Sequence, residues 1–199
     1  TRNKFWKGCF ELGLLVLRSG ERSIRLRPVL DVKSDIMDES VAIMLYLLFQ
    51  PVNGPVALLA TAFRLTHAAV YGATILTLYI PLIVLNADGG VTSYAAAPLY
   101  ALEAHSYGYV IGLVFFGVHC LLLGYLAIRS RGVPRILGGL LMLAGAGYLA
   151  DSFAQTLMVN YADVAEIFSM VVFIPAVIGE LSFCIWLLTR RTWSVQPRG

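Results

Sequence analysis

Charged residues are scarce in this sequence. Asp, Glu, Lys and Arg make up 14% of the 199 residues, whereas hydrophobic residues make up 58%. The mean hydropathy is +0.75, and a water-soluble domain of this length cannot hide so much apolar surface. The composition therefore excludes an ordinary soluble domain and predicts an integral protein whose partner is the lipid bilayer.

The small excess of positive charge does not point to nucleic acid. The net charge is +3, from 15 Lys and Arg against 12 Asp and Glu. Most of the basic residues stand at the ends of apolar runs, where they orient helices in a membrane. We therefore expect no nucleic-acid partner.

Cysteine is also scarce, and the known catalytic patterns are absent. Cys9, Cys120 and Cys184 are far apart, so neither a CxxC metal motif nor a disulfide framework is present. The patterns HExxH and GxSxG and the phosphate-binding P-loop do not occur either. We identify no catalytic residue and no metal site, and enzyme activity has the least support among the possible functions.

What the sequence has instead is apolar runs of membrane-spanning length. About 20 apolar residues are needed to cross roughly 30 Å of hydrocarbon. Five runs qualify and predict an all-α, polytopic helical membrane bundle: residues 30–49, 56–85, 105–128, 134–158 and 165–188. The second run is longer than a span requires, and Pro81 predicts a break near its far end.

Arginines set the expected orientation, because short loops rich in Lys and Arg stay in the cytoplasm. Arg129, Arg131 and Arg135 place the connector after the third run inside, and Arg190 with Arg191 places the C-terminus inside. The two assignments agree, since two spans separate them. We therefore expect a multi-pass protein of the inner membrane with a cytoplasmic C-terminus.

The N-terminal segment does not fit this orientation. The same alternation puts residues 1–27 outside, although they carry seven Lys and Arg residues, and the apolar stretch 8–17 is too short for a span. We divide the chain into an atypical basic segment (1–27), a helical transmembrane domain (28–190) and a cytoplasmic tail (191–199). We expect a longer or differently read chain to carry a further span.

Six ionisable side chains stand inside the predicted spans. Arg or Asp at mid-helix costs about 2.5 to 3.5 kcal/mol on insertion scales, so such residues normally face the protein interior. Counting about 1.5 Å per residue from the cytoplasmic ends puts all six near the middle of the membrane. This predicted polar layer consists of Asp38, Glu39, Arg64, His67, His119 and Glu180.

Other features are expected to surround this layer. Asp151 lies toward the outer side, and close helix packing is expected at Gly108-x-x-x-Gly112 and in AGAG at 144–147. Several tyrosines are expected to line or rim the same interior: Tyr71, Tyr107, Tyr109, Tyr148 and Tyr161.

Arg64 is the member of the layer that most needs a partner, and we expect it to pair with Glu180, Asp38 or Glu39. Three roles remain open for the layer. It can fix the register of the helices, or serve a small-molecule carrier or sensor in which Arg64 contacts an anion beside Glu180, His67 and His119. It can also hold a haem between His67 and His119; no other cofactor is expected, and nothing indicates an oligomeric state.

From about residue 23 onward the chain resembles the bacterial multi-pass membrane proteins grouped as domain of unknown function 4386. The resemblance is carried by SDIMDESVAIMLYLLFQPVN (34–53), ALLATAFRLTHAAVYG (57–72), HSYGYVIGLVFFGVHCLLLGYL (105–126), PRILGGLLMLAGAGYLADSFA (134–154) and GELSFCIWLL (179–188). It implies a six-span bundle whose first span is missing here, and residues 1–22 depart from the pattern. It implies no activity, substrate or catalytic residue.

Overall fold

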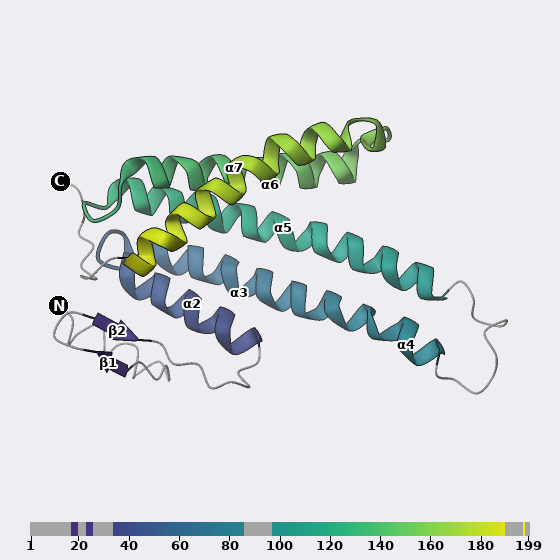
Figure 1. Ribbon diagram of the computed structural model, residues 1–199, viewed down its shortest axis with the longest axis horizontal. Coiled ribbons are helices and arrows are strands. Elements are labelled where there is room, and N and C mark those ends of the chain that lie inside the picture. The colour runs from purple at the N-terminus through teal and green to yellow at the C-terminus, as the bar shows by residue number, and fades with distance from the viewer. Residues whose placement is uncertain (1–16, 20–22, 26–33, 86–96, 190–196, 198–199) are drawn as a thin grey trace.

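The computed structural model describes residues 17–19, 23–25, 34–85, 97–189 and 197, apart from the side chains of 17–19, 23–25, 34–38, 82, 84, 85, 97, 167 and 169. The described parts form six helices and a small hairpin (Figure 1). The elements are β1 (Leu17–Ser19), β2 (Ser23–Arg25), α2 (Ser34–Phe49), α3 (Gly54–Thr77), α4 (Tyr79–Leu85), α5 (Ala97–Arg129), α6 (Arg135–Leu157) and α7 (Tyr161–Thr189).

Four stretches of helix are long and apolar enough to cross a membrane. They are Gly54–Pro81, Pro98–Arg129, Arg135–Leu157 and Met170–Thr189. They correspond to the predicted spans 56–85, 105–128, 134–158 and 165–188, and they confirm an all-helical chain with the features of a multi-pass membrane protein. Large apolar side chains such as Leu58 and Ile185, 58% and 59% exposed, cover the outside of the bundle, as contact with lipid requires.

The first predicted span, residues 30–49, is represented by the shorter helix α2. Its 16 residues correspond to about 24 Å of helix, and its part with described side chains, Glu39–Phe49, is an apolar helix of less than spanning length. The described residues therefore contain four candidate spans instead of the expected five. The antiparallel pairing of β1 with β2 is a second difference, since the sequence predicted no strand.

The predicted break near Pro81 is confirmed. Helix α3 ends at Thr77 and α4 begins at Tyr79. Pro81 has no N–H to bond the Thr77 carbonyl, and its ring crowds that carbonyl. The chain tightens at Leu78, whose N–H bonds the carbonyl of Ile75 at 3.0 Å.

Two turns join the helices at one end of the bundle, and side chains stabilise both. The Asn53 side chain caps α3 by accepting a hydrogen bond from the Val56 N–H at 3.2 Å. Between α5 and α6, the buried Ser130 hydroxyl donates to the Ala127 carbonyl at 2.8 Å and accepts from the Val133 N–H at 3.3 Å. Each turn thus satisfies backbone groups that its helix ends leave open.

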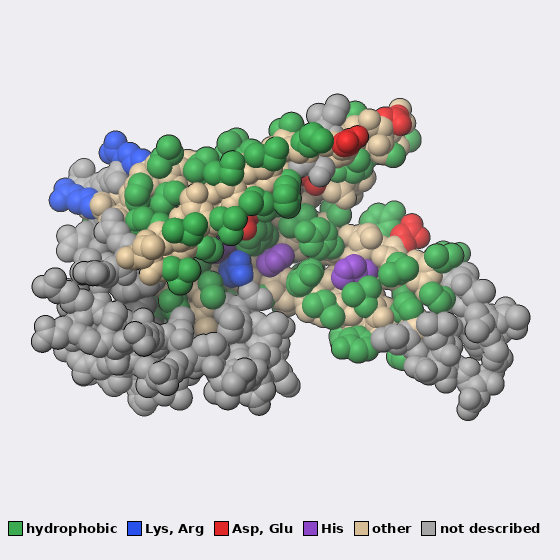
Figure 2. Space-filling model, viewed as in Figure 1, with side chains coloured by type: hydrophobic (Ala, Val, Ile, Leu, Met, Phe, Trp, Pro, Cys, Tyr) green, Lys and Arg blue, Asp and Glu red, His purple; other side chains and the backbone are tan. Residues whose placement is uncertain are grey.

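This end of the bundle carries the described basic side chains of the connectors, Arg129, Arg131 and Arg135, all exposed. Ser130 also forms a bridge with Pro197, so the C-terminal segment returns to the same end. Figure 2 shows Lys and Arg side chains here and Asp and Glu side chains at the opposite end. We call the two ends the basic end and the distal end.

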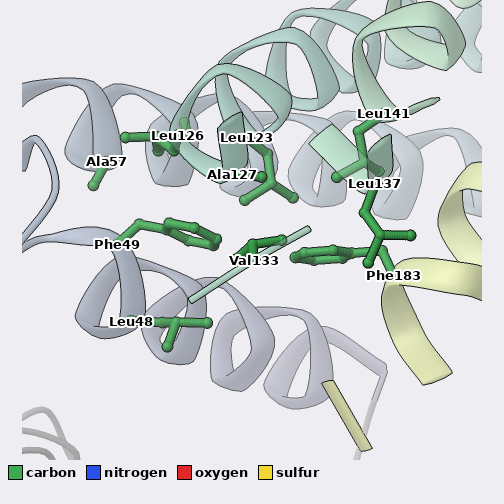
Figure 3. Packing of buried hydrophobic residues seen from close by; sticks show 11 residues of the cluster. Leu48, Phe49, Ala57, Leu123, Leu126, Ala127, Val133, Leu137, Leu141 and Phe183 are labelled. Carbon is green, nitrogen blue, oxygen red and sulfur yellow. The ribbon is translucent and has the colours of Figure 1, made fainter. Parts of the chain in front are cut away.

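An apolar core closes the basic end (Figure 3). Val133 lies between the rings of Phe49 and Phe183, and the three side chains are 1%, 0% and 4% exposed. Helices α2, α3, α5, α6 and α7 all contribute to it through Leu48, Phe49, Ala57, Ala60, Leu123, Leu126, Ala127, Val133, Leu137, Leu141 and Phe183.

Helices α5 and α6 are in backbone contact through two pairs of glycines. A Cβ atom on Gly124 would lie 2.6 Å from the Gly138 carbonyl oxygen, and one on Gly145 would lie 2.6 Å from that of Gly117. Both distances are far shorter than a normal carbon–oxygen contact, so only glycine permits this approach. Gly145 belongs to the AGAG run at 144–147, whose close packing is therefore confirmed.

The predicted Gly108-x-x-x-Gly112 pair packs closely against α3. A Cβ atom on Gly108 would collide with the side chain of Thr74, and one on Gly112 would lie 3.5 Å from the ring of His67. In the apolar part of Pro98–Arg129, 50% of the residues are buried inside the protein, whereas in the apolar part of Gly54–Pro81 only 11% are. Helix α5 is therefore the central helix, packed between α3 and α6.

Candidate functional site

A group of polar and aromatic side chains surrounds Phe116 on α5. The Phe116 ring centroid lies 5.0 Å from that of His67, 6.0 Å from that of His119 and 5.4 Å from that of Tyr148. The central carbon of the Arg64 guanidinium lies 5.4 Å from the same centroid, within cation–π distance. Residues from α3, α5 and α6 thus meet at one ring.

Helix α7 joins the group through Glu180. The Tyr148 hydroxyl donates a hydrogen bond to the Glu180 carboxylate at 2.7 Å, and the charges of Arg64 and Glu180 both act on the buried Cys120. Figure 2 shows basic, acidic and histidine side chains beside one another in the middle of an apolar surface. We call Arg64, His67, Phe116, His119, Tyr148 and Glu180 the Phe116 cluster.

The cluster contains four of the six residues of the predicted polar layer. Arg64, His119 and Glu180 each stand nine or ten residues from the basic end of their helices, which is about 15 Å and half the thickness of the hydrocarbon. Glu39 is exposed on α2, and the described contacts do not connect it to the cluster. Asp38 also lies on α2, but its side chain is outside the described residues.

The predicted ion pair of Arg64 with a carboxylate stays a prediction. For Glu180, the structure shows a neutral donor, Tyr148, at hydrogen-bond distance. A carboxylate at this depth needs such donors, because the hydrocarbon region contains no water that could hydrogen-bond to it instead. Tyr148 was expected to line the interior, but its role as partner of Glu180 was not foreseen.

All three histidines tie α3 to α5. Each Nδ1 lies within hydrogen-bond distance of a backbone carbonyl on the opposite helix, and because a carbonyl only accepts, Nδ1 is the donor. The distances are 2.9 Å from His67 to Gly112, 3.0 Å from His105 to Thr74 and 2.8 Å from His119 to Ala60. Helix packing thus accounts for histidines in an apolar run.

The contacts of the histidine rings concern the hypothesis that His67 and His119 hold a haem between them. His67 and His119 lie on the same α3–α5 interface, and the Phe116 ring packs against both imidazoles. A phenyl ring therefore occupies the space beside both proposed ligands. Among the described residues, no group of three or more His, Cys, Asp or Glu side chains is arranged to hold a metal ion.

A cavity of about 580 Å³ lies on the distal side of the Phe116 cluster, between α3, α5, α6 and α7. Its volume is in the range of small-molecule sites. Arg64, His67, His119 and Glu180 do not line it, so this cavity is distinct from the predicted polar layer. We call it the distal pocket, lined by Tyr71, His105, Ser106, Tyr109, Val110, Leu113, Tyr148, Asp151, Gln155, Tyr161, Val172 and Phe173.

Asp151 is the acidic residue of the distal pocket, and both of its oxygens accept hydrogen bonds. Oδ1 accepts from the Tyr161 hydroxyl at 2.6 Å, and Oδ2 accepts from the Gln155 amide at 2.8 Å. Partial burial, and then the bond to Asp151, raises the pKa of Tyr161 to about 12. The phenol therefore stays protonated and able to donate throughout the physiological pH range.

Four of the five tyrosines named from the sequence line the distal pocket: Tyr71, Tyr109, Tyr148 and Tyr161. The fifth, Tyr107, is 62% exposed and does not line it. The rings of Tyr71 and Tyr109 meet edge to face at 6.0 Å. Four of these tyrosines thus line a cavity beside the predicted polar layer, and Tyr148 also contacts Glu180 of that layer.

The sequence analysis missed Gln155 and Ser106 as pocket residues. A signal was present on α6, because Tyr148, Asp151 and Gln155 are spaced i, i+3 and i+7 and therefore share one helix face. Three polar side chains on one face of an apolar helix indicate that this face turns toward the protein.

Comparison with known proteins gives a family but no function. The family model for DUF4386, a domain of unknown function, matches residues 12–190. This match begins 11 residues before the start at residue 23 that the resemblance indicated, so residues 12–22 lie inside it. An uncharacterized protein from Archaeoglobus fulgidus is 28% identical over 155 residues, covering 78% of this chain and 77% of the relative. No solved structure matches the chain.

Proposed function

This chain belongs to the DUF4386 family, and we propose that it is a multi-pass membrane protein that binds a small molecule in the distal pocket, as a carrier or a sensor. The single observation that carries the proposal is the pocket itself. It combines about 580 Å³ of space with tyrosines and with Asp151, an ionisable residue inside a candidate span. Such a residue is costly in a membrane and by default indicates a functional site.

The two ends of the bundle differ in a way that suits binding from one side. The basic end is filled by the core around Val133, whereas the distal pocket lies at the other end of α6, with Asp151 16 residues, or about 24 Å, from Arg135. A ligand would therefore enter from the distal end and stop at the Phe116 cluster.

In this proposal the Phe116 cluster forms the floor of the site. Tyr148 lines the distal pocket and also donates to Glu180, so it connects the pocket to the charged groups below. Arg64, His67 and His119 support this floor without lining the pocket. The sequence-based hypothesis that Arg64 contacts an anion directly is thus replaced by an indirect role.

We further propose that the protein lies in the inner membrane and that its basic end faces the cytoplasm. Arg129, Arg131 and Arg135 are exposed at this end, and Pro197 bridges to Ser130 beside them. The positive-inside rule then places the C-terminal segment inside and the distal pocket outside.

The proposal predicts that water reaches the distal pocket. In a protein whose native cysteines are replaced by alanine, Leu113→Cys should react with a charged methanethiosulfonate reagent, because Leu113 lines the pocket. Ile111→Cys should not react, because Ile111 is 54% exposed on the outside of α5 and faces lipid. Mass spectrometry of the labelled protein in proteoliposomes measures both rates.

The two cysteine variants form a stringent comparison, because depth in the membrane alone would make Ile111→Cys react faster than Leu113→Cys. Ile111 is two residues closer to the distal end of α5 than Leu113. Reaction of Ile111→Cys at the same rate as Leu113→Cys, or faster, would show that the pocket is not a water-accessible site.

A further inference from the structure

We infer that the ligand of the distal pocket is an organic cation with an apolar body, held by the Asp151 carboxylate and by tyrosine ring faces. The inference rests on the proposed function, because it assumes that the pocket is a binding site. It is based on the charge of the lining, the nature of the side chains opposite Asp151 and the size of the cavity.

The charge of the lining favours a cation. Both hydrogen bonds to Asp151 come from neutral groups, Tyr161 and Gln155, and the described residues that line the pocket include no Lys or Arg. His105 is the basic side chain among them, and its Nδ1 donates to the Thr74 carbonyl. Within the described part of the wall, the negative charge of Asp151 therefore has no fixed positive partner.

A second negative group lies just below. The charges of Asp151 and Glu180 both act on Tyr109, so this ring lies in the field of both carboxylates. Arg64 belongs to the same cluster as Glu180, so the charge that favours a cation over an anion is that of Asp151 in the pocket wall.

The aromatic side chains suit an organic cation. Tyr71, Tyr109, Tyr161 and Phe173 line the pocket, and the faces of such rings carry partial negative charge that attracts ammonium groups. Aromatic side chains that line a pocket are a common means by which proteins recognise quaternary ammonium groups.

The apolar part of the wall and the volume indicate a ligand larger than a bare ion. Val110, Leu113 and Val172 complete the lining, and they offer no oxygen ligand to an inorganic cation. About 580 Å³ is enough for a molecule with an apolar body. The ligand class that matches the charged, aromatic and apolar parts of the pocket wall is therefore an amine or quaternary ammonium compound with an aliphatic or aromatic body.

The inference predicts charge-selective binding of a simple probe. Benzyltrimethylammonium should bind saturably to the purified protein in detergent and raise its unfolding temperature, whereas phenylmethanesulfonate, a similar body with a negative charge, should do neither. Asp151→Asn should weaken benzyltrimethylammonium binding by about tenfold or more, because it removes the counter-charge but keeps the size of the side chain. Isothermal titration calorimetry measures the affinities.

Three control variants separate binding from folding. Asp163→Asn removes an exposed carboxylate in the first turn of α7 and should leave the affinity unchanged. Asp151→Glu should restore part of the binding that Asp151→Asn loses. Tyr109→Leu, which removes an aromatic ring from the pocket wall, should bind more weakly than the native protein.

The outcomes distinguish this inference from the proposed function. Equal binding of the sulfonate, no binding of the ammonium probe, or no loss in Asp151→Asn would overturn the cation assignment. If Leu113→Cys still reacts selectively in that case, the pocket remains a binding site for another ligand class. If the thiol does not react either, the proposed function fails as well.

Discussion

Gly138→Ala should strongly destabilise the protein. The new Cβ atom would lie 2.7 Å from the Gly124 carbonyl oxygen and 2.9 Å from the Ile128 backbone nitrogen, and backbone atoms cannot rotate away as a side chain can. Helices α5 and α6 would have to separate. Overpacking of this kind costs about 1 to 3 kcal/mol, which unfolding by SDS in mixed micelles should measure as a loss of unfolding free energy.

The neighbouring glycine is a matched control with the opposite expected sign. Gly139 is exposed, and a Cβ atom there would meet nothing within 4 Å. Gly139→Ala should therefore be neutral or stabilise the helix by up to about 1 kcal/mol, because alanine is the better helix former. Equal loss of stability in both variants would contradict the close contact between α5 and α6.

Tyr148→Phe should be the second strongly destabilising change. It removes the hydroxyl that donates to Glu180 at 2.7 Å and leaves a carboxylate without this donor at the middle of the membrane. The loss of one partner of a buried charged group costs about 1 to 3 kcal/mol or more. The same unfolding measurement detects it.

Tyr109→Phe removes the hydroxyl of another tyrosine that lines the distal pocket and provides the control. The Tyr109 hydroxyl makes no hydrogen bond with a described residue, so its removal should change the unfolding free energy by less than about 0.5 kcal/mol. In a Glu180→Gln background, Tyr148→Phe should cost less, because the acceptor is no longer charged. An equal cost in both backgrounds would show that the bond to the Glu180 carboxylate does not stabilise the protein.

Composition and spacing predicted much of the fold. Apolar length alone located α3, α5, α6 and α7, because a helix that crosses hydrocarbon has few alternatives. The proline rule located the break before Pro81. Length gave a less complete result at residues 30–49, because the structure describes only residues 34–49 of this run, as helix α2.

Depth could be predicted, but direction could not. Counting residues placed Arg64, His119 and Glu180 at one level, and the structure gathers them around Phe116. Counting does not say how each helix is rotated about its axis. The contact of Glu180 with Tyr148 on α6 was therefore not foreseen.

The distal pocket was the hardest feature to predict, because it depends on how helices cross. The glycine pairs hold α5 and α6 together toward the basic end, and the polar face of α6 carrying Tyr148, Asp151 and Gln155 continues beyond them into the pocket. Both features can be read from the sequence, but the rotation of the helices relative to one another cannot. This rotation is what turns Asp151 and the tyrosines toward a common space.

The central claim is tested most directly by measuring from which side of the membrane the distal pocket can be reached. In intact cells, an impermeant thiol reagent added outside should label Leu113→Cys, whereas Arg131→Cys in the α5–α6 turn should be labelled only after permeabilisation. Labelling of Arg131→Cys in intact cells, together with protection of Leu113→Cys until the membrane is opened, would contradict a pocket that is closed at the basic end and open outside.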